Sequence, residues 1–180
     1  MKIAKAWILA LALGGTATAA MGEALVTKGA SEMAIDGMVD FATFQGVETE
    51  LAVRYGYFFI DRLSVGPKAM LYNNDAVNHL GLGMVAEYNF RLPPNYKPLF
   101  GTDLVPYVGG SVEYRRAKLF DETESAVVFG ADAGVKFFLT DTTALALSLR
   151  GELATEDVYD DDLEATDKNL ALLLGMRFYF

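Results

Sequence analysis

The chain has 180 residues, of which 52% are apolar, and it carries a formal charge of −9 and no cysteine. The length fits a single domain. The absence of cysteine excludes a disulfide framework and thiolate chemistry, and the negative charge argues against nucleic acid as a partner. No apolar run reaches the roughly 20 residues that a membrane-spanning helix needs.

The N-terminal 20 residues show the pattern of a secretory signal peptide. Lys2 and Lys5 precede the apolar run 6–13, and small residues follow, with Ala17-Thr18-Ala19 as the expected cleavage box. We therefore expect residues 1–19 to be a cleaved signal peptide. Residues 20–31 would then form a short N-terminal segment. An N-terminal membrane anchor is the alternative, although the apolar run is too short to span a bilayer.

The rest of the chain alternates between apolar and other residues with a period of two, which is typical of β-strands. The segments are about 9 to 12 residues long, enough to cross a bilayer at a tilt. We predict eight strands, at Glu32–Ala42, Thr49–Ile60, Ser64–Tyr72, Leu80–Phe90, Leu104–Arg115, Val127–Phe138, Thr143–Leu153 and Leu170–Phe180. The outer links between them are expected at residues 43–48, 73–79, 116–126 and 154–167.

One face of every predicted strand carries no charge, whereas the opposite face collects the charges and many glycines. This pattern favours an all-β fold, an eight-stranded antiparallel up-and-down transmembrane β-barrel over residues 32–180. Closure is required because an open sheet edge in lipid would leave backbone groups unpaired, at several kcal/mol each. A soluble lipocalin-like barrel is the alternative, because it shows the same alternation with the two faces exchanged.

Aromatic residues favour the membrane barrel over the soluble one. They end the even-numbered strands, and in an up-and-down barrel these ends share one rim. A ring of aromatic side chains is expected where a barrel meets the membrane interface. The predicted girdle consists of Tyr57, Phe59, Tyr88, Phe90 and Phe137. Both chain termini are expected at this rim, on the periplasmic side.

The sequence ends in the segment 175–180, GMRFYF. Together with the eight alternating segments, this ending resembles the small eight-stranded outer-membrane barrels of the OmpA/OmpX type. Gly175, Phe178 and Phe180 match that family's C-terminal signal for the barrel-assembly machinery, whereas the position two before the glycine, usually polar, is Leu173. The resemblance implies location in the bacterial outer membrane and contact with lipid and lipopolysaccharide. We expect a monomer that needs no cofactor.

The charged faces of the strands would line a lumen just wide enough for side chains to fill. Unpaired charges there would cost several kcal/mol each, so we expect them to pair and to close the lumen. The expected pairs are Lys68 with Glu87, Asp132 with Arg150, and Asp36 with Arg177. The predicted network consists of Asp36, Arg54, Lys68, Glu87, Glu113, Asp132, Lys136, Arg150, Glu152 and Arg177.

The pattern constrains function less than fold, because this barrel architecture hosts several roles. We expect a structural or surface-interaction role. A narrow gated channel is the alternative, since ionisable residues inside a membrane often mark ion paths. We do not expect an enzyme: the lipid A-modifying enzymes of this fold use a serine and a histidine near the outer rim, and the sole histidine, His79, has no serine close in the sequence.

The last outer link is rich in carboxylates. Asp157, Asp160, Asp161 and Asp162 lie within it, and such oxygens are ligands for divalent cations. Their spacing matches no EF-hand loop, so the sequence predicts a solvated acidic loop and no metal site.

Overall fold

The computed structural model describes residues 25–43, 46–73, 77–93, 102–119, 122–156, 159–161 and 164–180. The regular elements within these ranges are β-strands. No helix among the described residues is long and apolar enough to span a membrane. The predicted signal peptide and residues 20–24 lie outside the described residues.

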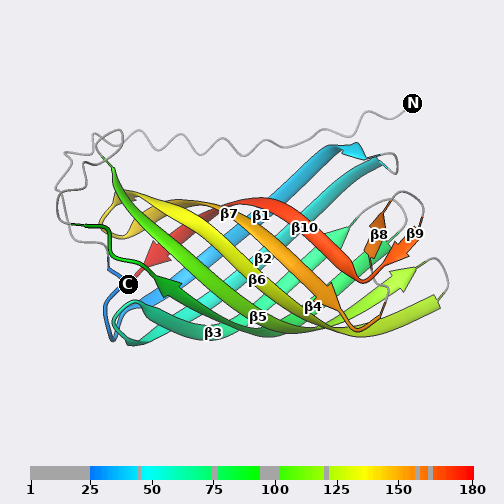
Figure 1. Ribbon diagram of the computed structural model, residues 1–180, viewed down its shortest axis with the longest axis horizontal. Coiled ribbons are helices and arrows are strands. Elements are labelled where there is room, and N and C mark those ends of the chain that lie inside the picture. The colour runs from blue at the N-terminus through cyan, green and yellow to red at the C-terminus, as the bar shows by residue number, and fades with distance from the viewer. Residues whose placement is uncertain are drawn as a thin grey trace.

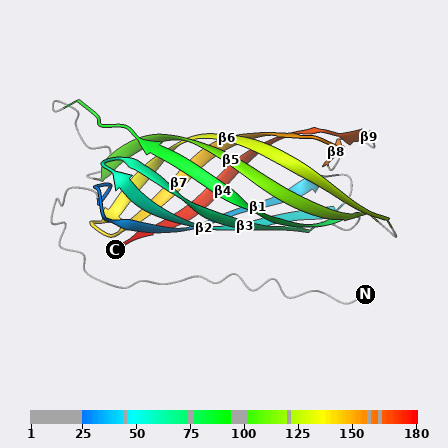
Figure 2. The same ribbon diagram turned by 90° about the horizontal axis from the view of Figure 1, so that it is seen from below.

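Eight long strands close into an antiparallel barrel (Figures 1 and 2). The eight are β1 (Ser31–Thr43), β2 (Gly46–Ile60), β3 (Leu63–Asn73), β4 (Val77–Asn89), β5 (Asp103–Leu119), β6 (Glu122–Thr140), β7 (Thr143–Ala154) and β10 (Lys168–Tyr179). Neighbouring strands follow the order β1-β10-β7-β6-β5-β4-β3-β2, and β2 pairs with β1. Two short strands, β8 (Tyr159–Asp161) and β9 (Glu164–Thr166), form a separate antiparallel sheet.

The predicted eight-stranded barrel is confirmed, but the outer links differ from expectation. β5 and β6 remain paired as far as Leu119 and Glu122, so residues 116–126, expected as a link, are mostly strand. The link 154–167 contains β8 and β9. The period-two apolar signal ends before both segments, but backbone pairing does not depend on it, so strands form there without that signal.

Exposure alternates along each strand, and β10 shows the pattern plainly. Leu170, Leu172 and Leu174 are 72, 62 and 55% exposed, whereas Ala171 and Leu173 between them are buried. On the other strands too, large apolar side chains face outward, and most charged side chains face the lumen. This is the reverse of the soluble lipocalin-like arrangement, which the structure therefore contradicts.

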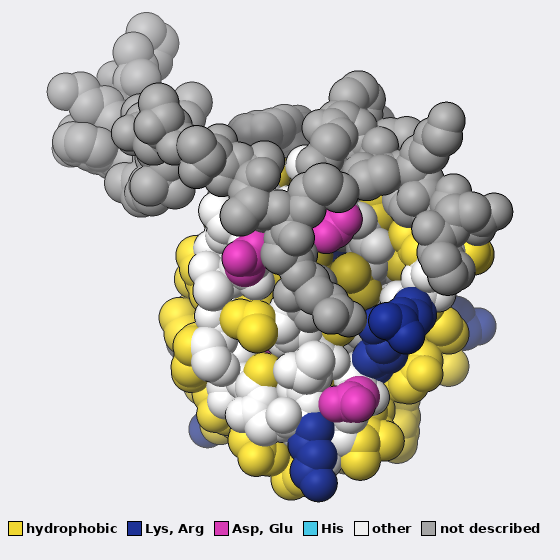
Figure 3. Space-filling view, turned by 90° about the vertical axis from the view of Figure 1, so that its left-hand side faces the viewer, with side chains coloured by type: hydrophobic (Ala, Val, Ile, Leu, Met, Phe, Trp, Pro, Cys, Tyr) yellow, Lys and Arg dark blue, Asp and Glu magenta, His cyan; other side chains and the backbone are white. Residues whose placement is uncertain are grey.

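A cluster of buried apolar side chains, which we call the apolar plug, lies inside the barrel at the end where the C-terminus lies (Figure 1). Its members come from five strands and from the segment before β1, and they are Val26, Phe58, Val105, Phe138, Ala144 and Tyr179. The ring centroids of Phe138 and Tyr179 are 5.2 Å apart, and those of Phe58 and Tyr179 are 6.4 Å apart. Figure 3 looks onto this end, where charged side chains lie on the end face and hydrophobic ones surround it.

Residues 25–30, which we call the strap, carry Val26 into this plug. The strap pairs with β2 through Gly29 N donating to Phe58 O (2.9 Å) and Phe58 N donating to Ala30 O (3.0 Å). It is also held by the turn after β2, where Arg62 N donates to Val26 O at 2.8 Å. The backbone of Gly29 has a φ of +92°, a conformation that favours glycine. The strap therefore docks through specific backbone hydrogen bonds.

Candidate functional site: a charge network in the lumen

The lumen-facing positions of all eight barrel strands contribute buried charged side chains. Along each strand they occupy every second position together with small residues. Because successive side chains of a strand point to opposite faces of the sheet, all of these positions face the barrel axis. The buried charged residues are Glu32, Asp36, Glu50, Arg54, Lys68, Glu87, Glu113, Arg115, Asp132, Lys136, Arg150, Glu152 and Arg177. Their contacts divide them into two groups.

The first group lies next to the apolar plug and begins at Lys136. Its ammonium Nζ lies 2.7 Å from Glu32 Oε2 and also contacts the carboxylate of Glu87. The same nitrogen lies 5.1 Å from the ring centroid of Tyr107 and 5.4 Å from that of Tyr179. Tyr179 belongs to the plug, so a cation–π contact joins the plug to the charged layer.

Two arginines complete this group. Arg177 Nη1 donates to Asp36 Oδ1 at 2.6 Å, and its Nε lies 3.5 Å from Glu32 Oε1. Arg54 Nε lies 3.0 Å from Asp36 Oδ2, and its Nη1 lies 3.4 Å from Glu87 Oε2. Because Arg177 contacts Glu32, with which Lys136 also pairs, the contacts of this group form a closed cycle.

We call this group the six-residue ring. In order of contact its members are Glu32, Lys136, Glu87, Arg54, Asp36, Arg177 and again Glu32. Acids and bases alternate around the ring, with three of each, so its formal charge is zero. Every member contacts two members of opposite sign, which offsets the cost of burying the charges.

The second group is a linear series of contacting charged side chains, which we call the outer chain. It lies on the side of the ring away from the plug. Arg150 Nε donates to Asp132 Oδ1 at 2.8 Å, and Arg150 Nη1 contacts the carboxylate of Glu50. Arg150 is also 4.0 Å from Glu152, to which Arg115 Nη1 donates at 3.0 Å.

The outer chain ends at a lysine on β3. Arg115 Nη2 lies 3.4 Å from Glu113 Oε2, and Lys68 Nζ donates to Glu113 Oε1 at 2.6 Å. The outer chain thus holds four carboxylates and three cations, a formal charge of −1. The ring is neutral, whereas the outer chain keeps one surplus acid.

The structure brings the ten predicted network residues together, five in the ring and five in the outer chain. Two of the three expected pairs are present, Asp132 with Arg150 and Asp36 with Arg177. The pair Lys68 with Glu87 is wrong, because Lys68 pairs with Glu113. Across β3 and β4, Lys68 is opposite Gly83 while Glu87 is opposite Ser64. That stagger of four residues separates the two side chains by about 13 Å along the strands.

Three charged members are absent from the predicted network: Glu32, which the sequence analysis missed, and Glu50 and Arg115, which belong to the charged strand faces but were left out of the network. Each lies an even number of residues from a predicted member of its own strand and so faces the lumen as that member does. This spacing is the sequence signal that marks them. Glu32 also opens its strand, where alternation has only just begun.

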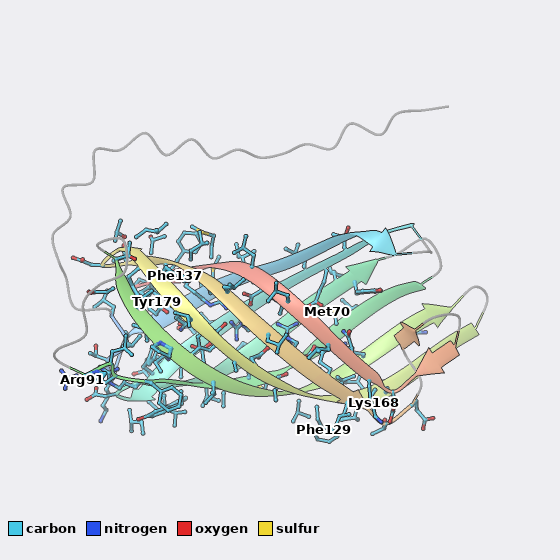
Figure 4. All side chains as sticks on the ribbon, turned by 45° about the horizontal axis from the view of Figure 1, so that its top comes forward. Met70, Arg91, Phe129, Phe137, Lys168 and Tyr179 are labelled. Carbon is cyan, nitrogen blue, oxygen red and sulfur yellow. The ribbon has the colours of Figure 1, made fainter. Side chains whose placement is uncertain are left out.

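The predicted girdle residues lie on the outside of the barrel near the end that holds the C-terminus. Tyr57, Phe59, Tyr88 and Phe90 are exposed, and Phe137 is half-buried. Figure 4 shows Phe137 pointing away from the barrel near this end, while Tyr179 lies inside. Tyr57 and Phe59 form an edge-to-face pair with centroids 5.0 Å apart, and Tyr88 and Phe90 form another at 5.1 Å.

The residues of the expected assembly signal lie at the end of the last strand. Gly175 faces the lumen, whereas Phe178 and Phe180 face outward and are 37 and 66% exposed. Phe180 exchanges two backbone hydrogen bonds with Ser31, at 2.8 and 3.0 Å, and so joins the end of the chain to β1.

The remaining candidates fall mostly outside what the structure describes. Asp157 and Asp162 lie outside the described residues, and Asp160 and Asp161 belong to β8 without described side chains. His79 lies in β4, and its side chain is likewise not described. Among the described residues, no group of three or more histidines, cysteines or carboxylates is placed to hold a metal ion.

Solved structures with the same architecture come from the outer membranes of bacteria and from design. The N-terminal β-barrel domain of Pseudomonas aeruginosa OprF has a TM-score of 0.61 and 19% identity, over 85% of this chain and 98% of that one. Neisserial surface protein A has a TM-score of 0.56 and 17% identity, over 84 and 95% of the two chains. A de novo designed transmembrane β-barrel has a TM-score of 0.53 and 16% identity, over 86 and 98%. No family model and no curated protein matches the sequence.

Proposed function

Because the chain has the fold of the small eight-stranded outer-membrane β-barrels, we propose that it is an integral outer-membrane protein with a structural or surface-interaction role. In this proposal the lumen is closed to ions, and both termini face the periplasm. The observation that carries it is the six-residue ring, in which each buried charge already contacts two opposite charges. A permeating ion would have to break contacts that the ring makes with itself.

The apolar plug supports a closed lumen independently of the ring. Val26, Phe58 and Tyr179 are each at most 3% exposed and lie between the ring and the end that holds the C-terminus. An apolar layer offers no ligand to replace the hydration shell of an ion. Two barriers of different chemistry thus lie in series along the barrel axis.

The outer surface supports insertion in a bilayer. Large apolar side chains are exposed on every barrel strand. Soluble monomeric proteins rarely expose so continuous an apolar surface to water. The aromatic residues at the terminal end would lie at one membrane interface, as the girdles of membrane barrels do. Membrane lipid and lipopolysaccharide are the partners that this surface fits, and Gly175, Phe178 and Phe180 would be read by the assembly machinery.

The test is electrical. The protein without residues 1–19, purified and inserted into a planar lipid bilayer, is expected to show no steady conductance. A variant that lacks the strap and carries Glu87→Ser with Lys136→Ser, which removes one acid and one base from the ring, is expected to conduct and so shows that the assay detects an opened lumen. A steady conductance of the unaltered protein would overturn the closed lumen and would support a narrow channel instead.

A further inference from the structure

The ladder that closes the barrel is incomplete. β1 pairs with β10 from Glu32 opposite Tyr179 as far as Gly37 opposite Leu174. Beyond that point β1 continues to Thr43 beside β2, and β10 continues back to Lys168 beside β7. Among the described strands, these two outer halves have no ladder between them, and Figure 1 shows β1 and β10 diverging toward the end of the barrel away from the C-terminus.

Backbone groups therefore face the gap. Ser31 and Phe180 exchange both of their backbone hydrogen bonds, so every second residue from Ser31 along β1 directs its N–H and C=O toward β10. Val39 is one of these residues, and Leu172 is the residue of β10 that the same register would place opposite it. Neither makes that pair in the structure.

The open edge lies at the level of the apolar surface. Leu170 and Leu172 on the β10 side are 72 and 62% exposed, the side chains expected to meet hydrocarbon. Lipid tails cannot accept or donate hydrogen bonds, so an open sheet edge there needs a strand or water as its partner. This step rests on the proposed membrane location.

We propose that this edge is an interface with a second copy of the same chain. The strand that fits the outer half of β10 is the outer half of β1, because it continues the antiparallel register that already joins residues 32–37 to 174–179. Within one chain the two halves have diverged. In a two-fold pair of chains, β1 of each copy lies against β10 of the other, and both edges are satisfied at once.

The side chains of β10 suit such a contact. From Leu170 to Leu174 both faces of the strand are apolar, with Ala171 and Leu173 turned inward and buried. β1 of a second copy, placed beside this part of β10, would therefore meet only apolar side chains of β10. The proposal differs from the monomer expected from the sequence.

The test uses cysteine, which the natural chain lacks. Val39→Cys and Leu172→Cys are made as single variants with different tags, mixed, and reconstituted at low protein-to-lipid ratio. A short bifunctional thiol reagent is then added. The expected result is a band of twice the monomer mass that carries both tags, and its absence would overturn the proposal.

The double variant Val39→Cys with Leu172→Cys tests closure of the seam within one chain. A shift in monomer mobility with no dimer means that the seam closes on itself, which also overturns the proposal. Ile35→Cys and Met176→Cys form the matched control, because they are opposite each other in the paired half of the same ladder. That pair is expected to link only within one chain. The closed-lumen proposal does not depend on either outcome, because conductance tests it separately.

Discussion

Asp36 and Arg177 meet over the α-carbon of Gly175. Arg177 Nη1 donates to Asp36 Oδ1 at 2.6 Å, and a Cβ atom built on Gly175 would lie 2.1 Å from that oxygen and 2.7 Å from that nitrogen. It would also lie 2.8 Å from the backbone oxygen of Ile35, which cannot move as a side chain can. A side chain at position 175 would therefore displace one link of the six-residue ring.

The first prediction concerns Gly175→Ala. We expect it to lower the free energy of unfolding by about 1–3 kcal/mol, the usual cost of overpacking a close-packed interior. The change is measured by unfolding the protein with urea in detergent, with the circular dichroism signal of the β-sheet as the readout. Gly151→Ala is the matched control on β7, because a Cβ there would meet nothing within 4 Å. Equal effects of the two substitutions would contradict this account of Gly175.

The second prediction concerns the charge balance of the ring. Lys136→Met leaves Glu32 and Glu87 without their shared cation, and removing one partner of a buried pair costs about 3–5 kcal/mol. Adding Glu87→Gln restores equal numbers of acids and bases in the ring. We therefore expect the double variant to be more stable than Lys136→Met alone.

The same unfolding experiment measures all of these variants. Lys28→Met is the control, because Lys28 is an exposed lysine of the strap whose hydrogen bond to Asp61 is made by its backbone nitrogen and survives the substitution. Substitutions at such surface positions usually change stability by less than about 0.5 kcal/mol. If Glu87→Gln lowered the free energy of unfolding of Lys136→Met further, the contact of Glu87 with Arg54, and not the charge balance of the ring, would dominate.

The amino-acid pattern was sufficient to predict the barrel and the membership of most of the network. Alternation with a period of two assigns each side chain to the lumen or to the outside without knowledge of its partner. That is why Arg54, Asp132 and Arg150 could be placed in the lumen from the sequence. The pairing depends on a different quantity, the register of each ladder, which alternation does not contain.

Lys68 shows what register decides. Its partner across β3 and β4 is a glycine, Gly83, and its side chain reaches Glu113 on β5. Val26 shows a second limit, because it precedes the first strand and no periodicity marks its burial. It enters the plug only because the strap pairs with Phe58 of β2.

The third prediction concerns the docking of the strap. Val26→Asp places a carboxylate among the apolar side chains of the plug, and burying a charge in apolar surroundings is costly, so we expect the strap to undock while the barrel stays folded. Hydrogen exchange is the measurement: the amides of Gly29 and Arg62, which donate to Phe58 and Val26, should lose protection. Thr27→Asp introduces the same charge at an exposed strap position and should leave protection unchanged. Protection that survives Val26→Asp would show that burial of Val26 does not hold the strap.

The fourth prediction concerns the depth of the aromatic girdle in the bilayer. The only tryptophan, Trp7, lies in the expected signal peptide, so the chain without residues 1–19 has no native tryptophan fluorescence. Phe59→Trp and Leu149→Trp introduce single reporters at exposed positions, the first at the terminal rim and the second in the middle of β7.

If the aromatic rim lies at the membrane interface, bilayers with brominated lipids will quench the two reporters differently. Bromine close to the headgroups should quench Phe59→Trp more strongly, and bromine deep in the acyl chains should quench Leu149→Trp more strongly, because aromatic girdles lie at headgroup level and barrel midpoints in hydrocarbon. Leu149→Trp serves as the internal control for insertion. Quenching of Phe59→Trp by the deep bromine alone would place the rim inside the hydrocarbon and contradict the girdle, while the absence of quenching at both positions would contradict insertion itself.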